Sequence, residues 1–167
     1  AAVGAAVGSR AGVGGGNALM RGSPLDRVRR GDLSVGRHEP RGALDVELTI
    51  CGRTVHVLNT HLGLWPRERP QQADRLLELL SLSRRDLTIL MGDLNEWHGW
   101  GKSLRGLRRV FGSPAAPVTF PARWPVLALD RIWIFPAQAL LTVEAHDTPR
   151  SRLASDHLPV KADIYLP

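Results

Sequence analysis

The feature that most restricts the possible folds of this chain is a run of alternating apolar and polar residues at 43–50. The apolar members of the run are Leu44, Val46, Leu48 and Ile50. A period of two is typical of a strand with one buried face. A turn at 51–53 and a second strand at 54–60 complete a predicted β-hairpin. A half-buried hairpin needs further layers against which its apolar face can pack.

The spacing of apolar residues then changes to that of a helix and later returns to that of strands. A stripe of apolar residues after Pro70 predicts a helix with Pro70 near its first turn. The stripe consists of Ala73, Leu76, Leu77 and Leu80. Further strands are predicted at 87–91, which is wholly apolar as in a central strand, and at 129–135, 140–145 and 158–166. With a loop and one short helix at 98–117, this order favours a layered α/β or α+β fold.

Composition excludes several classes of protein. The chain has 167 residues, 43% of them hydrophobic, which suits one globular domain with a substantial core. A single cysteine, Cys51, excludes an intrachain disulfide and a cysteine-rich zinc site. No run approaches the roughly 20 apolar residues of a membrane span. The net charge of +6 favours anionic partners such as nucleic acid or phospholipid headgroups, and an arginine-rich composition without a binding role is the alternative.

The beginning of the chain differs in composition from the rest. Residues 1–16 are almost all Ala, Gly and Val, which predicts a flexible start or the remnant of a loop. Residues 17–167 are expected to form one domain, because no linker or internal repeat interrupts them. The opening run is too short and too rich in glycine for a signal peptide, so we expect a cytoplasmic protein. We also expect a monomer.

Residues capable of acid–base or ligand chemistry gather where the predicted strands begin or end. They are His61, Asp93, Asn95, Asp130, Asp156 and His157. In layered sheet proteins, functional groups collect on the loops at strand ends. The positions of these residues therefore predict one shared site.

Each of these residue types has a chemical role and a structural alternative. Asp93 can orient a water molecule and accept its proton, and Asn95 can hold a phosphoryl oxygen or steady that water. Asp156 is a natural oxygen ligand for Mg²⁺. His157 can act on a phosphate, with Asp130 fixing its tautomer. Taken singly, each residue is also explained by an Asx turn, a cap or a satisfied half-buried histidine, so the ordered set carries the hypothesis.

Six short stretches contain these residues or accompany them. They are Gly16-Asn17-Ala18-Leu19, Glu39-Pro40-Arg41-Gly42-Ala43-Leu44, Leu58-Asn59-Thr60-His61-Leu62, Met91-Gly92-Asp93-Leu94-Asn95-Glu96-Trp97, Leu129-Asp130-Arg131-Ile132 and Ser155-Asp156-His157-Leu158-Pro159-Val160. In this order they resemble the motifs of the endonuclease/exonuclease/phosphatase superfamily. That group includes deoxyribonucleases, abasic-site endonucleases, inositol-polyphosphate phosphatases and bacterial sphingomyelinases. The similarity extends from about residue 16 to the end, and small bacterial members are the most similar.

The resemblance implies a fold, a reaction and a role for each residue. The fold would be a four-layered sandwich of two mainly antiparallel sheets flanked by helices, here without its first strands. The residues implied at the substrate phosphate are His61, Asn95, His157 and Arg41. Asp93 would align or deprotonate the attacking water, Asp130 would pair with His157, and Asp156 would belong to a Mg²⁺ or Mn²⁺ site. The reaction would be in-line displacement by water at a phosphodiester.

The chain departs from the pattern of this superfamily at its start. Members begin with a strand bearing an Asn and a second strand ending in Gln-Glu, whose Glu is the principal metal ligand. Neither stretch is present, and the first acidic residue is Asp26. We expect a weak metal site, exposed sheet edges and low activity of this chain alone. Equal Mg²⁺-dependent cleavage of bis-p-nitrophenyl phosphate by this chain and by one carrying both stretches would overturn that expectation.

Three functions stay open at this point. They are a nuclease-like phosphodiesterase, a phosphomonoesterase or lipid phosphodiesterase of the same fold, and an inactive nucleic-acid-binding module. Trp65, Trp97 and Trp100 could stack on bases or sit at a lipid interface, with partial packing against neighbouring loops as the alternative. Trp133 is expected in the core. Salt-dependent DNA binding without cleavage would favour the binding module.

Overall fold

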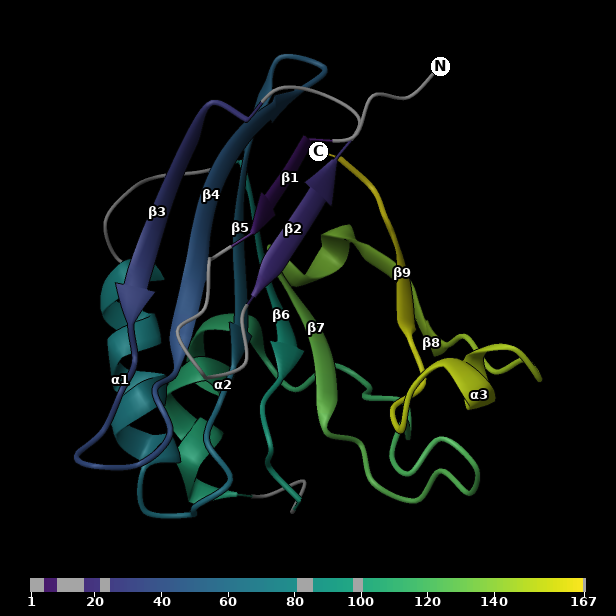
Figure 1. The fold of residues 1–167 in the computed structure, drawn as a ribbon. Helices are drawn as coiled ribbons and strands as arrows, with labels where there is room; N and C mark the ends of the chain where they lie inside the picture. The colour runs from purple at the N-terminus through teal and green to yellow at the C-terminus, as the bar shows by residue number, and fades with distance from the viewer. Residues whose placement is uncertain (1–4, 9–16, 22–24, 81–85, 98–100, 167) are drawn as a thin grey trace.

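The computed structural model describes residues 5–8, 17–21, 25–80, 86–97 and 101–166 (Figure 1). Its framework is a five-stranded sheet with the strand order β3-β4-β5-β6-β7. The strands are β3 (Arg27–Asp32), β4 (Gly42–Ile50), β5 (Arg53–His61), β6 (Leu87–Asp93) and β7 (Asp130–Phe135). Neighbouring strands are antiparallel except β5 and β6, which are parallel. The parallel pair places the ends of β5 and β6 at the same edge of the sheet, beside the start of β7.

The β4–β5 hairpin confirms the hairpin predicted from the alternating pattern. Its register pairs Val46 with Val57, so that apolar side chains share one face. Cys51 and Gly52 form the turn with φ values of 50° and 77°. Two residues in the left-handed region match the right-handed twist of the flanking strands, which is the usual turn of a tight hairpin.

Helices cover one face of the five-stranded sheet. They are α1 (Arg69–Leu80) and α2 (Arg105–Phe111), preceded by the short 3₁₀ helix η1 (Lys102–Leu104). Between helices and sheet lies a buried apolar cluster of Leu33, Ala43, Leu58, Leu62, Ala73, Leu76, Leu90, Leu94, Leu104, Leu107, Phe111 and Trp133. The predicted apolar stripe of α1, the short helix within 98–117 and the core position of Trp133 are thereby confirmed.

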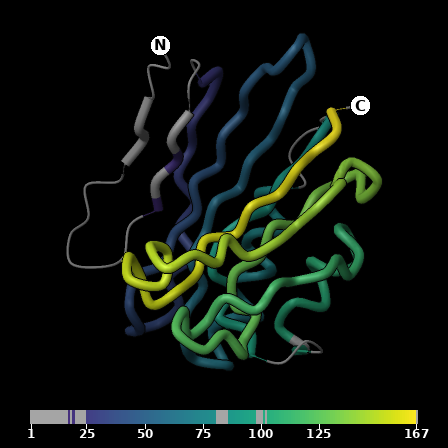
Figure 2. Tube along the Cα trace, turned by 90° about the vertical axis from the view of Figure 1, so that its right-hand side faces the viewer, coloured from purple at the N-terminus to yellow at the C-terminus, as the bar shows by residue number. Residues whose placement is uncertain are grey.

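Strands of two smaller sheets cover the opposite face. β1 (Ala5–Gly8) pairs with β2 (Ala18–Arg21), and β8 (Leu140–Ala145) pairs with β9 (Val160–Ile164). A second apolar cluster lies between them and the large sheet; its buried members are Leu19, Leu44, Val46, Leu48, Val55, Val57, Leu87, Ile134 and Ala139. Figure 2 shows the β8–β9 pair in front of the long central strands. The arrangement confirms the predicted sandwich of mainly antiparallel sheets flanked by helices.

Three features of the fold differ from the sequence-based prediction. β3 was not predicted, because Arg27–Asp32 reads Arg-Val-Arg-Arg-Gly-Asp and most of it is exposed at the sheet edge. The short helix α3 (Ser151–Ala154) was not predicted either. The last strand, predicted at 158–166, is shorter, because β9 begins only after Pro159 and ends at Ile164.

The beginning of the chain holds a strand that composition did not predict. Ala5–Gly8 pairs as β1 with β2, whereas the rest of residues 1–16 lies outside the described residues. The boundary between a flexible start and the domain stays a prediction. No helix in the described part of the chain is long and apolar enough to cross a bilayer.

Candidate active site

Three strands of the large sheet bring polar residues to one edge. β5 ends at His61, β6 ends at Asp93 and β7 begins at Asp130. The parallel pairing of β5 with β6 sets His61 beside Asp93 in register. The antiparallel pairing of β6 with β7 sets Asp93 opposite Asp130. The backbone of the sheet therefore aligns the first three members of the site.

The ring of His61 faces the carboxylate of Asp93. His61 Nε2 lies 3.4 Å from Asp93 Oδ2, and Asp93 Oδ1 accepts a hydrogen bond of 2.8 Å from the backbone N–H of Asn95. Burial raises the pKa of Asp93 above its ordinary value, although the Asn95 hydrogen bond opposes this change. Burial, assisted by the positive charge of Arg41, lowers the pKa of His61. A carboxylate with a raised pKa is a better proton acceptor near neutral pH.

His157 is oriented by a carboxylate on β7. Its Nδ1 lies 2.8 Å from Asp130 Oδ2, which also accepts a 2.6 Å hydrogen bond from Thr119 Oγ1. The ring of Phe120 lies 4.8 Å from the imidazole, centroid to centroid. Burial lowers the pKa of His157, but the hydrogen bond and charge of Asp130 outweigh it, so the pKa is raised overall. The pairing leaves Nε2 as the ring nitrogen available to a substrate.

The Gly-Asp-Leu-Asn stretch begins within the last residues of β6, and its glycine is required by the close approach of β5. Gly92 has φ of 135°, and a Cβ added there would clash with the carbonyl oxygen of Thr60. Only glycine permits β6 to approach β5 so closely at this point. Asn95 is buried with φ of 49°, and its side-chain Nδ2 donates a 2.8 Å hydrogen bond to the Leu62 carbonyl. Asn95 thus ties the loop after β6 to the loop after β5.

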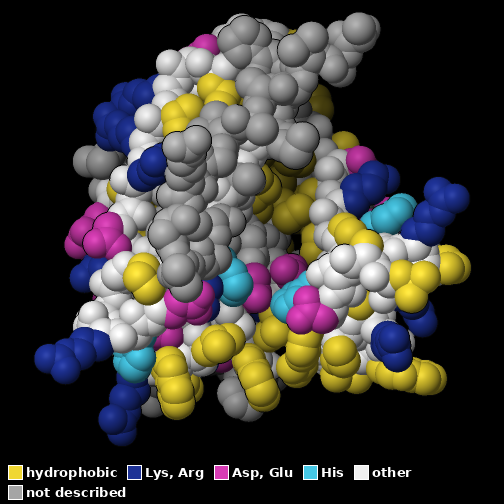
Figure 3. All heavy atoms as spheres, in the orientation of Figure 1, with side chains coloured by type: hydrophobic (Ala, Val, Ile, Leu, Met, Phe, Trp, Pro, Cys, Tyr) yellow, Lys and Arg dark blue, Asp and Glu magenta, His cyan; other side chains and the backbone are white. Residues whose placement is uncertain are grey.

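The structure gathers three of the predicted site residues into one cluster. Oxygen or nitrogen atoms of Asp93, Asp130 and His157 all lie within 4.8 Å of one another. Figure 3 shows acidic and histidine side chains together in the lower half of the molecule, above the hydrophobic side chains of its lower edge. Asn95 adjoins this cluster through its bond to Asp93. The structure therefore brings these four residues together, and their role as a site stays a prediction.

Asp156, predicted as a metal ligand, lies outside that three-residue cluster. Its side chain is exposed, and its Oδ1 accepts a 3.3 Å hydrogen bond from Ser155 Oγ. Its negative charge still contributes to the raised pKa of His157. The two carboxylates that the sheet brings together are Asp93 and Asp130. A role for Asp156 as a ligand stays a prediction.

Arg41, predicted to contact substrate, is buried beside the site. Its Nη2 donates a 2.6 Å hydrogen bond to Glu39 Oε2, and its charge lowers the pKa of His61. Asn17, from the first motif, donates a 2.7 Å hydrogen bond to the Gly42 carbonyl, which also accepts from Thr60 Oγ1 at 3.1 Å. The contacts of Asn17 and Thr60 hold the start of β4 in place next to the end of β5. Substrate contact by Arg41 stays a prediction.

A buried polar network supports the loop that follows His61. This network was not predicted from the sequence. Arg69 Nη1 donates to the carbonyl oxygens of Gly63 and Leu64 at 3.4 and 2.7 Å. Gln72 Oε1 accepts a 2.8 Å hydrogen bond from the Gly63 N–H. The first turn of α1 therefore holds the backbone next to His61 in place.

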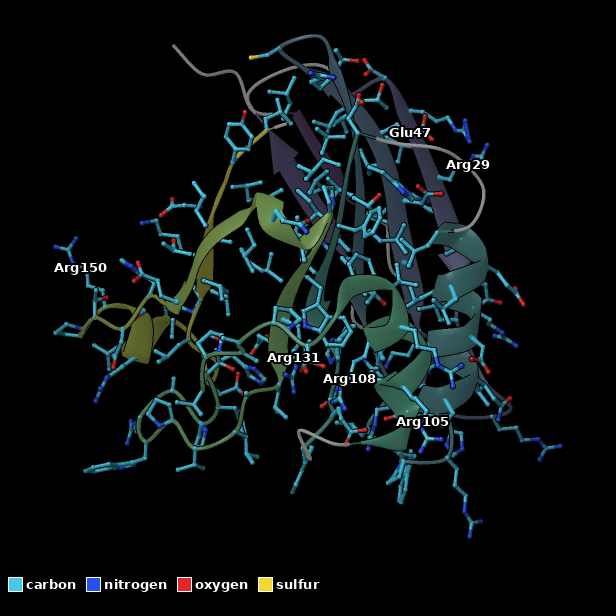
Figure 4. All side chains as sticks on the ribbon, turned by 180° about the vertical axis from the view of Figure 1, so that it is seen from behind. Arg29, Glu47, Arg105, Arg108, Arg131 and Arg150 are labelled. Atoms are coloured by element: carbon cyan, nitrogen blue, oxygen red, sulfur yellow. The ribbon has the colours of Figure 1, made fainter. Side chains whose placement is uncertain are left out.

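The same network reaches the loop that contains Asn95. Arg69 Nε lies 3.9 Å from Glu96 Oε2, which also accepts a hydrogen bond from Ser103. Arg131 Nη2 donates to the Glu96 carbonyl at 3.5 Å, and Figure 4 shows Arg131 near Arg108 of α2. The position of Glu96 directly after Asn95 was the available sequence signal. Burial of a charge did not distinguish it, because Arg41, Asp45, Glu68 and Arg131 are buried as well.

A cavity of about 550 Å³ opens beside this network. Its lining residues are Leu64, Pro66, Arg69, Pro70, Glu96, Trp97, Gly101 and Ser103. Trp97 is exposed, Trp65 is exposed with its ring 6.2 Å from that of His38, and Trp100 lies outside the described residues. A volume of this size is within the range of small-molecule sites, so the cavity offers room for a small molecule beside Arg69 and Glu96.

Comparison with known proteins places the chain in a family. The sequence profile of the Endonuclease/Exonuclease/phosphatase family matches residues 3–157. The "Uncharacterized protein YbhP" of Escherichia coli (strain K12) is 33% identical over 162 residues, which cover 90% of this chain and 63% of YbhP. The chain therefore spans less than two thirds of the length of that relative.

Solved structures show the same fold at low sequence identity. The endonuclease/exonuclease/phosphatase of Bacteroides vulgatus has a TM-score of 0.78 and 19% identity, covering 99% of this chain and 76% of that chain. The mannosyl-6-phosphatase Bt3783 of Bacteroides thetaiotaomicron has a TM-score of 0.74 and 16% identity, covering 97% and 77%. Together with the profile match, the strand order and the clustered motifs show that this chain belongs to the endonuclease/exonuclease/phosphatase family.

Proposed function

We propose that the cluster at the edge of the large sheet hydrolyses a phosphodiester by in-line attack of water. The observation that carries the proposal is the convergence of Asp93, Asp130 and His157 within 4.8 Å, from segments far apart in the sequence. The name of the family to which the chain belongs supports the same reaction class. A half-buried group of two carboxylates and one imidazole suits proton transfer and the binding of a charged phosphate.

Asp93 is the group that aligns and deprotonates the attacking water. Its raised pKa brings the carboxylate closer to neutral pH, where it accepts a proton more effectively. The Asn95 N–H holds Oδ1, and His61 adjoins Oδ2, so the orientation of the carboxylate is set from both sides. Asn95 serves here as the residue that fixes the loop carrying Asp93.

His157 is the group that binds the phosphoryl oxygens. Its raised pKa favours the charged imidazolium at neutral pH, which suits an anionic substrate. Asp130 holds Nδ1, as in catalytic triads, and is itself held by Thr119. His61 and the nearby charge of Arg41 add further positive potential at the same edge.

The donor atoms of the cluster also fit a divalent cation. Mg²⁺ and Mn²⁺ prefer carboxylate oxygens, and Asp93 and Asp130 supply them within ligand reach of each other. We propose that these two aspartates are the residues that would hold the ion. When bound, such an ion neutralises charge on the phosphoryl oxygens and lowers the pKa of a bound water.

Hydrolysis of bis-p-nitrophenyl phosphate with Mg²⁺ or Mn²⁺ tests the proposal. Asp93→Asn and His157→Ala should each lower the rate by about 100-fold or more relative to the wild-type chain measured in parallel, because each removes a group that acts in proton transfer or charge stabilisation. Chelation by EDTA should abolish the activity. Asp147→Asn is the matched control, because this exposed carboxylate pairs with Arg152 outside the cluster. Unchanged hydrolysis by both site variants would refute the proposal.

A phosphomonoester is the second candidate substrate. The observation in its favour is the buried charge of Arg41 next to His61, because a terminal phosphate carries more negative charge than a diester. The ratio of p-nitrophenyl phosphate to bis-p-nitrophenyl phosphate hydrolysis decides between the two. An Arg41→Gln variant that loses only the monoesterase activity would assign Arg41 to the terminal phosphate.

A further inference from the structure

Two exposed loops of this chain each contain a Trp-Pro pair. The first is Leu64-Trp65-Pro66-Arg67 and the second is Arg123-Trp124-Pro125-Val126. In each loop a tryptophan precedes a proline, and an arginine and an aliphatic residue lie close by. The exposed fractions of the apolar side chains are 62% for Leu64, 62% for Trp65, 80% for Trp124 and 69% for Val126.

These two loops lie on opposite sides of the candidate active site. The first follows His61 and is tied to the loop of Asn95 through Arg69 and Glu96. The second leads from Phe120, which packs on His157, to Asp130. Figure 3 shows hydrophobic side chains along the lower edge of the molecule on both sides of the acidic and histidine residues.

The backbone of both loops is held in place, so the exposed side chains are presented by an ordered scaffold. The Trp65 N–H donates to Glu68 Oε1 at 3.0 Å. The Trp124 N–H donates to the Pro121 carbonyl at 3.0 Å, and the Ala122 N–H donates to the Asp156 carbonyl at 2.7 Å. Ordered loops that expose several large apolar side chains together are typical of an interaction surface.

We propose that these two loops dock the active-site edge onto the surface of an anionic lipid bilayer. The docking edge consists of Leu64, Trp65, Arg67, Arg123, Trp124 and Val126. Tryptophan has an apolar ring and a polar N–H, which favours the boundary between headgroups and acyl chains. Arg67 and Arg123 complement the negative charge of anionic headgroups. The inference rests on the proposed function, because docking of this edge presents the catalytic cluster to phosphate esters at the membrane surface.

The composition of the docking edge favours a bilayer over single-stranded nucleic acid. Bases bind to aromatic platforms by stacking, which an aliphatic side chain does not provide. Leu64 and Val126 are each more than 60% exposed, as are the tryptophans beside them. Insertion into the headgroup region removes aliphatic and aromatic surfaces from water alike, so a bilayer accounts for all four apolar residues.

Co-sedimentation with vesicles tests the docking edge. The wild-type chain should bind vesicles of phosphatidylcholine mixed with phosphatidylglycerol more tightly than vesicles of phosphatidylcholine alone, and less tightly as salt is added. Trp65→Ala combined with Trp124→Ala should weaken binding by at least about tenfold, since each change removes a large apolar ring. Arg67→Gln and Arg123→Gln should each weaken it about fivefold.

Tyr165→Ala is the matched control for loss of an exposed aromatic side chain. Tyr165 is 60% exposed, and its N–H bonds to the Ala139 carbonyl, beyond the end of β7 that is remote from Asp130. This variant should bind vesicles as the wild type does. Circular dichroism of every variant checks that the fold is retained.

The outcomes separate the docking edge from the proposed function. Absence of binding to the mixed vesicles, or full binding by the double tryptophan variant, would overturn the docking edge. The docking edge would also be overturned if the wild type bound oligodeoxythymidine more tightly than the mixed vesicles and the double tryptophan variant lost that binding. The two loops would then bind a nucleic acid. Hydrolysis of soluble bis-p-nitrophenyl phosphate by the wild type is measured alongside.

If the wild type binds the mixed vesicles but does not hydrolyse this substrate, the proposed function is rejected and the docking edge is supported.

Discussion

The charge of the site is governed by the pairing of His157 with Asp130. Burial disfavours a charged imidazole, yet the carboxylate 2.8 Å away reverses the balance and raises the pKa of His157. A histidine whose pKa is higher in the folded state stabilises the fold most below its unfolded pKa of about 6.5, and that contribution is lost as the pH rises through the folded pKa. The pair should therefore stabilise the protein in mildly acidic solution and less in alkaline solution.

Asp130→Asn should lower the pKa of His157, because the hydrogen-bonded negative charge is removed while the burial of the ring remains. NMR titration of the imidazole signals in EDTA measures this directly. Asp156→Asn is the control, since its charge is the weakest of the named causes and its loss should lower the pKa less. An equal pKa in Asp130→Asn and the wild type would contradict the assigned cause.

At the scale of elements, the first turn of α1 connects the loops that follow β5 and β6. Arg69 lies at the start of α1 and is buried; it donates a hydrogen bond to the Leu64 carbonyl, and its Nε lies 3.9 Å from Glu96 Oε2. A buried charge that loses its partner destabilises a fold more than the absence of both charges. The ion pair should therefore fix the relative position of His61 and Asn95 as well as contribute to stability.

Arg69→Met should lower the free energy of unfolding by about 3 kcal/mol, because it removes the positive charge 3.9 Å from the buried Glu96 and the hydrogen bonds to the Gly63 and Leu64 carbonyls. Urea denaturation measures the loss. Adding Glu96→Gln to Arg69→Met should recover part of the stability, since a buried negative charge is then removed as well. A double variant that is less stable than Arg69→Met by the full cost of Glu96→Gln alone would show that the two side chains are not coupled.

At the scale of the whole molecule, the large sheet carries a separate apolar core on each face. The helix side includes Leu76, Leu90 and Trp133, whereas the other side includes Val46 and Ile134. Because both cores use residues of β4, β5, β6 and β7, loss of packing on one face should weaken the entire sandwich. We therefore expect one cooperative unfolding transition.

Leu76→Ala should lower the free energy of unfolding by about 2–5 kcal/mol, because it opens a cavity between α1 and the sheet. Far-ultraviolet circular dichroism and tryptophan fluorescence should report the same shifted midpoint in urea. Leu153→Ala is the control, because this leucine is 81% exposed and its loss should change stability by less than about 0.5 kcal/mol. Separate transitions for the two probes would contradict a single cooperative unit.

Local periodicity was enough to predict the elements that present a regular apolar face. Leu44, Val46 and Leu48 of β4 are buried, and the stripe of α1 packs in the core, as the periodicity predicts. The pattern did not record that β4 also buries Asp45 on its other face, whereas Ile50 is exposed. Polar residues at the ends of these strands also marked the position of the site. β3 escaped prediction because an exposed edge strand is held by backbone hydrogen bonds to β4, which leave no hydrophobic pattern.

The sequence by itself therefore determined the central strands, the first long helix, the family resemblance and the residues of the candidate cluster. Only the tertiary structure decided that Asp93 groups with Asp130 and His157 while Asp156 stays outside, and that Arg69 links two loops through its hydrogen bonds and its approach to Glu96. It also decided that the loop of Trp65 follows β5 and the loop of Trp124 precedes β7, with β6 between these strands. The physical reason is that a periodic pattern reports which face of one element is buried, within a few residues. The order and direction of β5, β6 and β7 determine which distant side chains meet, and no local pattern records that order.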